Sequence, residues 1–349
     1  MTLLHFVNRV LTLLDALRTY FVHYLPKKGL ADLAKNDRYE RLRSAFASKK
    51  TDIYLLFLSE ALPLFQEMQL FLQRDDPIGP EYVYRICGMM ASLGGRFLLP
   101  SVCEDIVVSK ISTSSTAPEN HSSDVDIGHR TERLCLKNLQ SAEMTHFKLE
   151  AKAFYLEAFH ATMSNLKLDQ KEHMRLWRKL TLLCPQNRTF QSDKDKTTKL
   201  KNLTFLAGLI PTIKVDDMQP LIEEWKQLAI NNDIQPLKEE RLDAYWSKIF
   251  EKHKYPLIKV LVQALLCIQP HNAAEERGFS VNAAVVTKER NRLQPETLNG
   301  IRRVRSHLKN IDGLQHFSVT QSLIDLARSS SRRYFQSYEH DSASDDEES

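Results

Sequence analysis

The sequence has little glycine and proline, with 10 and 13 of its 349 residues. A β-sandwich or barrel needs a turn about every 8–12 residues, so this composition argues against an all-β fold. Neither GxGxxG nor GxxxxGK[ST] occurs, which argues against a phosphate-cradling loop. No stretch approaches about 18 uninterrupted apolar residues, so no membrane span or membrane partner is expected. These absences favour a helix-rich globular protein.

The five cysteines lie far apart and form no CxxC pair. This odd, dispersed set indicates reduced thiols in an intracellular protein rather than a disulfide framework or a zinc site. The twelve histidines are also dispersed, and HExxH is absent, so we expect no metal site and no cofactor. The expected location is the nucleus or the cytoplasm, with the nucleus favoured.

Charge is distributed unevenly along the chain. The net charge is +4, yet residues 338–349 hold six acids and no Lys or Arg, so the rest carries +10. A basic body with an acidic tail is compatible with nucleic-acid contact but does not establish it.

Helical periodicity dominates what is present. The patterns predict helices over 2–25, 36–48, 52–74, 82–99, 132–170, 217–231, 238–251, 256–268, 272–287 and 296–309. Pro63 should kink or divide the apolar run at 52–74. Polar residues predict a flexible loop at 110–130 and a break at 185–201, and 203–214 is a poor candidate for a strand. The predicted fold class is mainly α.

Residues 255–308 carry the most information. Glu276, Phe279, Ala283 and Val286 are spaced three, four and three residues apart, which places a carboxylate on an apolar helix stripe. Such a carboxylate needs a partner. A buried Arg or Lys is one alternative, and a Mg²⁺ ion shared with other carboxylates is the other.

Several motifs in this stretch follow one another in a specific order. They are Tyr255-Pro256-Leu257, HNAAEERGFS at 271–280 and RNRLQPETL at 290–298, with Trp246 upstream. This order resembles the C-terminal dimerisation region of hAT-type DNA transposases. The resemblance extends more loosely over residues 6–310, including 51–105, DVDIGHR at 124–130 and 176–188.

The resemblance implies a domain organisation. Residues 1–50 would be N-terminal helices left from an RNase H-like region, and 51–200 would be the family's helical insertion domain, containing the loop at 110–130. Residues 201–312 would be the dimerisation region, made of the C-terminal helices of the RNase H-like domain. Residues 313–349 would be a Ser-rich, acidic tail, expected to be disordered at its end.

The resemblance also has an implication for catalytic activity. Active members cut and join DNA with two Asp and one Glu that bind divalent metal, and Glu276 matches the glutamate. The two aspartates and the zinc-finger module belong to family segments with no counterpart in this sequence. We therefore expect a domesticated or truncated derivative that is not an enzyme, with Glu276 as a vestige. Residual metal-dependent strand transfer, completed in trans by a partner, is an alternative.

The leading expectation is dimerisation with itself or with another hAT-like protein. The residues expected to serve it are Tyr255, Leu257, Phe279, Leu293, Leu298, Ile301, Val304 and Leu308. The apolar face of the last four could equally pack within its own domain.

The alternative partner is DNA, because residues 288–309 hold seven basic residues and two acids. The expected phosphate contacts are Lys288, Arg290, Arg292, Arg302, Arg303 and Arg305. A charge run on a helix can also be a solvated face.

Overall fold

A computed structural model describes residues 3–28, 36–107, 111–231, 241–270, 279, 285, 295–311 and 313–330. The structure is 78% helical and has no strand in its described part, which confirms the mainly α prediction. The chain divides into two compact units, residues 1–273 and 274–349. Each is described by itself.

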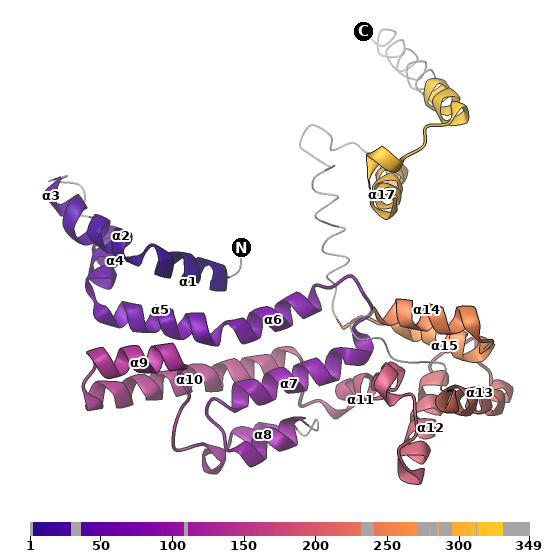
Figure 1. The fold of residues 1–349 in the computed structure, drawn as a ribbon, viewed down its shortest axis with the longest axis horizontal. Coiled ribbons are helices and arrows are strands. Elements are labelled where there is room, and N and C mark those ends of the chain that lie inside the picture. The colour runs from indigo at the N-terminus through magenta and orange to yellow at the C-terminus, as the bar shows by residue number, and fades with distance from the viewer. Residues whose placement is uncertain are drawn as a thin grey trace, which may run out of the picture. The chain divides into compact units, whose positions relative to one another are not determined.

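The first unit begins with short helices that pack on one another (Figure 1). Within this group, 19–24 form a π-helix rather than the continuous α-helix expected over 2–25. Arg18 donates to the Phe46 carbonyl of α4, at 2.8 Å, and joins the group to the next helix through Asp52, at 2.5 Å. The elements are α1 (Leu3–Thr12), α2 (Leu14–Arg18), η1 (Thr19–Tyr24), α3 (Leu25–Lys27) and α4 (Asp37–Ala47).

The apolar run divides at Pro63, as predicted, into α5 (Lys49–Ala61) and α6 (Pro63–Leu72). Among the described residues, only this joined segment is long and apolar enough to cross a membrane. One such helix is weak grounds for a membrane protein, because a core helix of a globular protein has the same length and composition. Ile53, Phe57 and Met68 of this segment are buried in the core.

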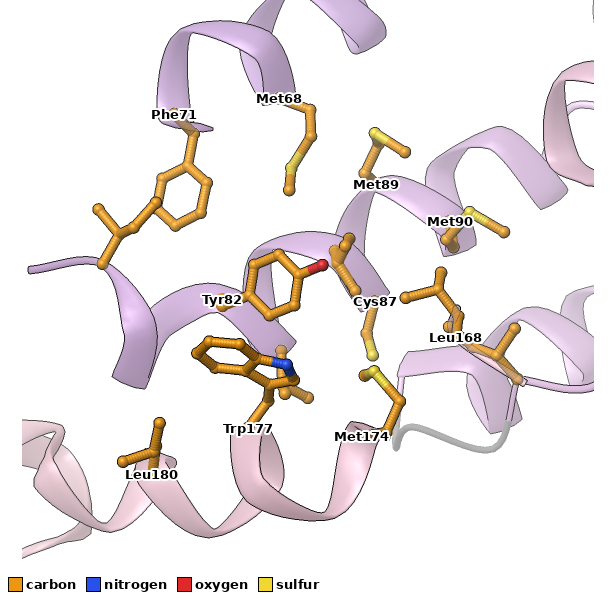
Figure 2. Close-up of a cluster of buried hydrophobic side chains, with 14 of the residues drawn as sticks. Met68, Phe71, Tyr82, Cys87, Met89, Met90, Leu168, Met174, Trp177 and Leu180 are labelled. Atoms are coloured by element: carbon orange, nitrogen blue, oxygen red, sulfur yellow. The ribbon is translucent and has the colours of Figure 1, made fainter. Parts of the chain in front are cut away.

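A second group of helices packs beneath α5 and α6. Its core contains Tyr82 and Trp177, whose rings meet edge to face at 5.1 Å (Figure 2). Burial raises the pKa of Tyr82 to about 12. The elements are η2 (Gly79–Glu81), α7 (Tyr82–Gly94), α8 (Pro100–Val107), η3 (Thr113–Thr116), η4 (Pro118–Asn120), α9 (His129–Asn138), α10 (Ser141–Asn165), α11 (Lys171–Leu180), η5 (Thr181–Leu183) and η6 (Pro185–Asn187).

The first turn of α9 is held by Glu60 of α5. Its carboxylate accepts hydrogen bonds from the backbone N–H groups of Arg130 and Thr131, at 3.0 and 2.9 Å, and from Thr131 Oγ1 at 2.6 Å. Burial alone would raise the pKa of Glu60, but these hydrogen bonds outweigh it and lower the pKa. Gly128 has φ of +88°, and a Cβ there would lie 2.5 Å from Glu60 Oε2, so this close approach requires glycine. The flexibility expected at 110–130 concerns motion and stays a prediction, although Val125 and Ile127 are buried.

Three further expectations about helices and strands were wrong. The helix expected at 132–170 is two helices, because Gln140 is extended and forms a capping box with Glu143 at the start of α10. The polar break at 185–201 contains the start of α12 (Asp193–Ala207), whose first turn is capped by Ser192. The strand candidate at 203–214 begins inside the same helix, where Leu203, Leu206 and Ala207 form a buried face.

The first unit ends with η7 (Val215–Asp217), α13 (Met218–Ile230), α14 (Leu242–Lys252) and α15 (Pro256–Leu266), close to the predicted bounds. The described part of the second unit contains α17 (Pro295–Asn310), η9 (Leu314–His316) and helical residues 321–330. Gly313, with φ of +109°, donates its backbone N–H to the Leu308 carbonyl at 2.8 Å and ends α17. The helix expected at 272–287 falls almost wholly outside the described residues.

Candidate functional site

Helices α13, α14 and α15 form a bundle, called the α13–α15 bundle below, around two tryptophans. Trp225 and Trp246 are fully buried, and their ring centroids lie 6.3 Å apart. Trp246 also stacks on Phe250 at 5.7 Å. From α15, Ile258 and Leu261 belong to the same core. The apolar side of all three helices is therefore used inside the first unit.

The start of α15 is held by a carboxylate from α13. Glu224 accepts backbone hydrogen bonds from Leu257, at 3.1 Å, and from Ile258, at 3.0 Å. These N–H groups have no partner inside the helix, because they belong to its first turn. Pro256 at the first position has no N–H to satisfy. The Tyr255-Pro256-Leu257 motif thus begins a helix that a neighbouring helix caps.

The end of α13 is held in a comparable way by a buried arginine. Arg188 Nη1 donates to the carbonyls of Leu228, at 2.5 Å, and Asn231, at 2.8 Å. A cation at the carboxyl end of a helix is favourable because that end carries a partial negative charge. Trp246 Nε1 in turn donates to the Leu183 carbonyl at 3.1 Å. These contacts tie the α13–α15 bundle to residues 183–188, so the two segments fold as one body.

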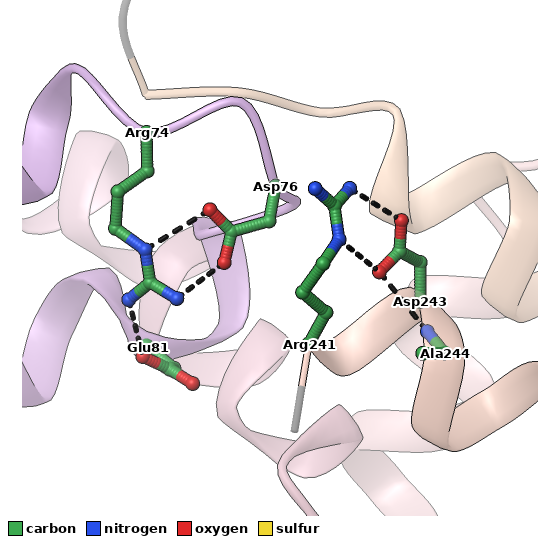
Figure 3. A network of polar contacts seen from close by, with 6 residues as sticks. All are labelled: Arg74, Asp76, Glu81, Arg241, Asp243 and Ala244. Carbon is green, nitrogen blue, oxygen red and sulfur yellow. Dashed lines mark hydrogen bonds and ion pairs between the residues drawn. The ribbon is translucent and has the colours of Figure 1, made fainter. Parts of the chain in front are cut away.

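Two arginine–carboxylate pairs lie near each other at the start of α14 (Figure 3). Arg241 contacts both carboxylate oxygens of Asp243, at 3.0 and 2.8 Å. Arg74 binds Asp76 and lies 3.8 Å from Glu81. The hydrogen bonds from Arg241 hold the pKa of the Asp243 carboxyl below its usual range.

Within the described residues, no group of three or more His, Cys, Asp or Glu could hold a metal ion.

Helix α17, in the second unit, has an apolar stripe that its own unit covers incompletely. Leu298, Ile301, Val304 and Leu308 follow one another at steps of three, three and four residues, so they share one side of the helix. We call them the α17 face. Three are half-buried, and Val304 is 56% exposed. More exposed apolar side chains follow in this unit at Leu314, Val319, Leu323 and Leu326.

Two of the three arginines of α17 share one side of the helix. Arg302, Arg303 and Arg305 are all exposed, as a phosphate contact requires. Arg302 and Arg305 lie three residues apart and are neighbours on one side, whereas Arg303 lies about 100° around the helix from Arg302. Arg305 also lies beside the α17 face, being four residues from Ile301.

The predicted dimerisation residues separate into two groups. Tyr255 is buried and Leu257 is half-buried, and both pack against the core of the first unit. Phe279 is 69% exposed, and the α17 face is as described above. Leu293 lies outside the described residues, as do Glu276, Lys288, Arg290 and Arg292.

Sequence reasoning missed Glu224 and Arg188 as organising residues. The signal for Glu224 was available, since it lies three residues after Leu221 and four before Leu228 on the buried stripe. That is the pattern that singled out Glu276. Arg188 lies in an irregular segment after Cys184, where no periodicity marks a buried side chain.

One protein-family model matches the part of the chain that contains these helices. Residues 219–308 match the model of the hAT family C-terminal dimerisation region. No curated protein and no solved structure matches the chain. The boundary between the two units, at 273/274, falls inside the matched range. The match joins the α13–α15 bundle and α17 in one family region, and it supports an hAT transposase-derived protein.

Proposed function

We propose that the chain is a dimerisation module that pairs with itself, or with another hAT-like protein, through the α17 face. The observation that carries this proposal is the contrast inside the matched region. The α13–α15 bundle buries most of its large apolar side chains in its own unit, with Ile230 and Val260 as exposed exceptions, whereas Val304 and Phe279 of the second unit stay exposed. Exposed apolar side chains that gather in one part of a chain are typical of interaction sites.

The area that a stable interface buries supports extending the proposed interface to the residues that follow α17. A stable interface buries about 800 Å² on each partner, more than one stripe of a single helix supplies. Leu314, Val319, Leu323 and Leu326 add exposed apolar surface in the same unit. The proposed interface is therefore the α17 face together with apolar side chains from 314–326.

Sedimentation velocity of the full chain over a concentration series tests this proposal. The expected result is a shift from a species of 40.4 kDa to one of twice that mass as concentration rises to tens of micromolar. A single species at the monomer mass over the whole series would contradict it.

We also propose that the chain alone does not cut or join DNA. The support is that only Glu276 corresponds to a family carboxylate, and two-metal chemistry needs several carboxylates converging on the ions. Nuclease and strand-transfer assays with Mg²⁺ or Mn²⁺, on wild type and Glu276→Ala, should show no activity in either protein. Activity in the wild type that Glu276→Ala abolishes would contradict this.

A further inference from the structure

A hollow of about 810 Å³ lies beside α11 in the first unit. We call it the α11 hollow. Four basic side chains line it, against two carboxylates, Asp169 and Glu172. The basic residues are Lys171, Arg175, Arg178 and Lys179, and Ser112 and Asn202 also line the hollow.

Helix α11 packs against the core of the first unit through the side that faces away from the hollow. Met174, Trp177 and Leu180, spaced three residues apart, are buried in the core between α7 and α11 (Figure 2). Lys171, Arg175 and Lys179 follow one another four residues apart, so they share the other side of the helix. The buried anchors therefore fix the direction in which the basic side chains leave the helix.

Two of these cations rest on one aromatic ring. Arg175 and Lys179 lie over Phe205 of α12, at 4.8 and 4.5 Å from the ring centroid. Lys179 Nζ also donates to Asn202 Oδ1 at 2.8 Å. Burial, together with the nearby charge of Arg175, lowers the pKa of Lys179. Two positive charges are thus held close together, and an anion bound beside them would offset their mutual repulsion.

The carboxylates that line the hollow offset the charge of Arg175 only weakly. Glu172 lies 3.3 Å from Arg175 and is 84% exposed, so its pairing is a surface one. Such pairs contribute little. Asp169 is exposed on the rim.

We propose that the α11 hollow binds a small, multiply phosphorylated anion. Guanidinium groups bind phosphate oxygens through paired hydrogen bonds, and ammonium groups bind them as point charges. Several phosphates on one molecule match several converging cations. The volume is that of a small-molecule site. Duplex DNA fits less well, because its phosphates follow one another along a backbone and do not converge on one point as the cations of the hollow do.

Isothermal titration calorimetry on the full chain tests this site, with inositol hexakisphosphate and tripolyphosphate as probes and orthophosphate and a short DNA duplex as comparison arms. The expected result is saturable, one-to-one binding of the two polyphosphate probes that weakens as salt rises. Orthophosphate should bind at least about tenfold more weakly, because it engages fewer cations. No saturable heat with either polyphosphate, or binding of the duplex alone, would overturn the proposal.

Charge reversal with a matched control makes the test specific. Arg175→Glu should weaken polyphosphate binding by about tenfold or more. Arg43→Glu is the control, because Arg43 is also half-exposed and also pairs with a glutamate three residues before it. If Arg175→Glu fails to fold by circular dichroism, the exposed Lys171→Glu replaces it with the same expectation. An equal loss in the control would contradict a site at α11.

Discussion

The two halves of the matched family region use their apolar residues in opposite ways. In the α13–α15 bundle, Trp225, Trp246 and Ile258 are buried, and Glu224 and Arg188 cap the helices from neighbouring segments. On α17, the stripe is only half-covered, and Val304 is exposed. A region that one family model covers can thus contain helices that pack within the chain and a helix whose apolar side is only partly covered. The difference predicts that substitutions in the bundle change stability, whereas substitutions on the α17 face change association.

The largest expected effect on stability is that of Trp246→Ala. The substitution leaves a cavity, and the Leu183 carbonyl loses the indole N–H. Truncating a buried tryptophan costs about 3–5 kcal/mol. Urea unfolding followed by circular dichroism measures this loss. Val304→Ala is the counterpart in α17 and should change the free energy of unfolding by less than about 0.5 kcal/mol; equal losses would remove the distinction between the two halves.

A smaller effect is expected for Glu224→Ala. This variant leaves the first N–H groups of α15 without their carboxylate, at a cost of about 0.5–2 kcal/mol, the range for losing a helix cap. Its neighbour Glu223 is a matched control, because it is exposed and pairs only with surface groups such as Lys226. Thermal or urea unfolding of both variants should separate them. A Glu223→Ala variant as unstable as Glu224→Ala would argue against a cap.

The smallest expected effect on stability is the pH dependence from Asp243. Its folded pKa is lowered by Arg241, so the ion pair stabilises the protein above the unfolded value of about 3.9. That contribution is lost as pH falls through the lower, folded pKa. Because Asp243 is half-exposed, Asp243→Asn should cost less than about 1 kcal/mol at pH 7, and the gap from wild type should close in acid. Asp216→Asn, which removes an exposed carboxylate in η7, is the control; a gap that widens in acid would contradict the assignment.

The sequence predicted most helices because their apolar residues recur at helical spacing. Pro63 marked the division of α5 from α6, since proline cannot continue a helix interior without strain. The polar composition of residues 185–201 concealed α12. There, Ser192 and the acids at 193 and 195 are the start signals of an exposed first turn.

The candidate site was predictable only in part. The motif at 255–257 and the stripe on α17 were visible in the sequence, but spacing alone could not tell which of them is covered by its own unit. That depends on contacts between segments distant along the chain, such as Arg188 with Leu228. Charge counts likewise predicted a basic segment at 288–309 without showing that Arg302, Arg303 and Arg305 are all exposed on α17.

The comparison of Val304→Asp with Val215→Asp in sedimentation equilibrium tests the central claim most directly. Val215 is 85% exposed in the first unit, so the pair places the same charge on two exposed valines. We predict that Val304→Asp raises the dimer dissociation constant by at least tenfold, about 1.4 kcal/mol, while Val215→Asp leaves it at the wild-type value. A Val304→Asp protein that dimerises as tightly as the wild type would contradict the assignment of the α17 face as the dimer interface.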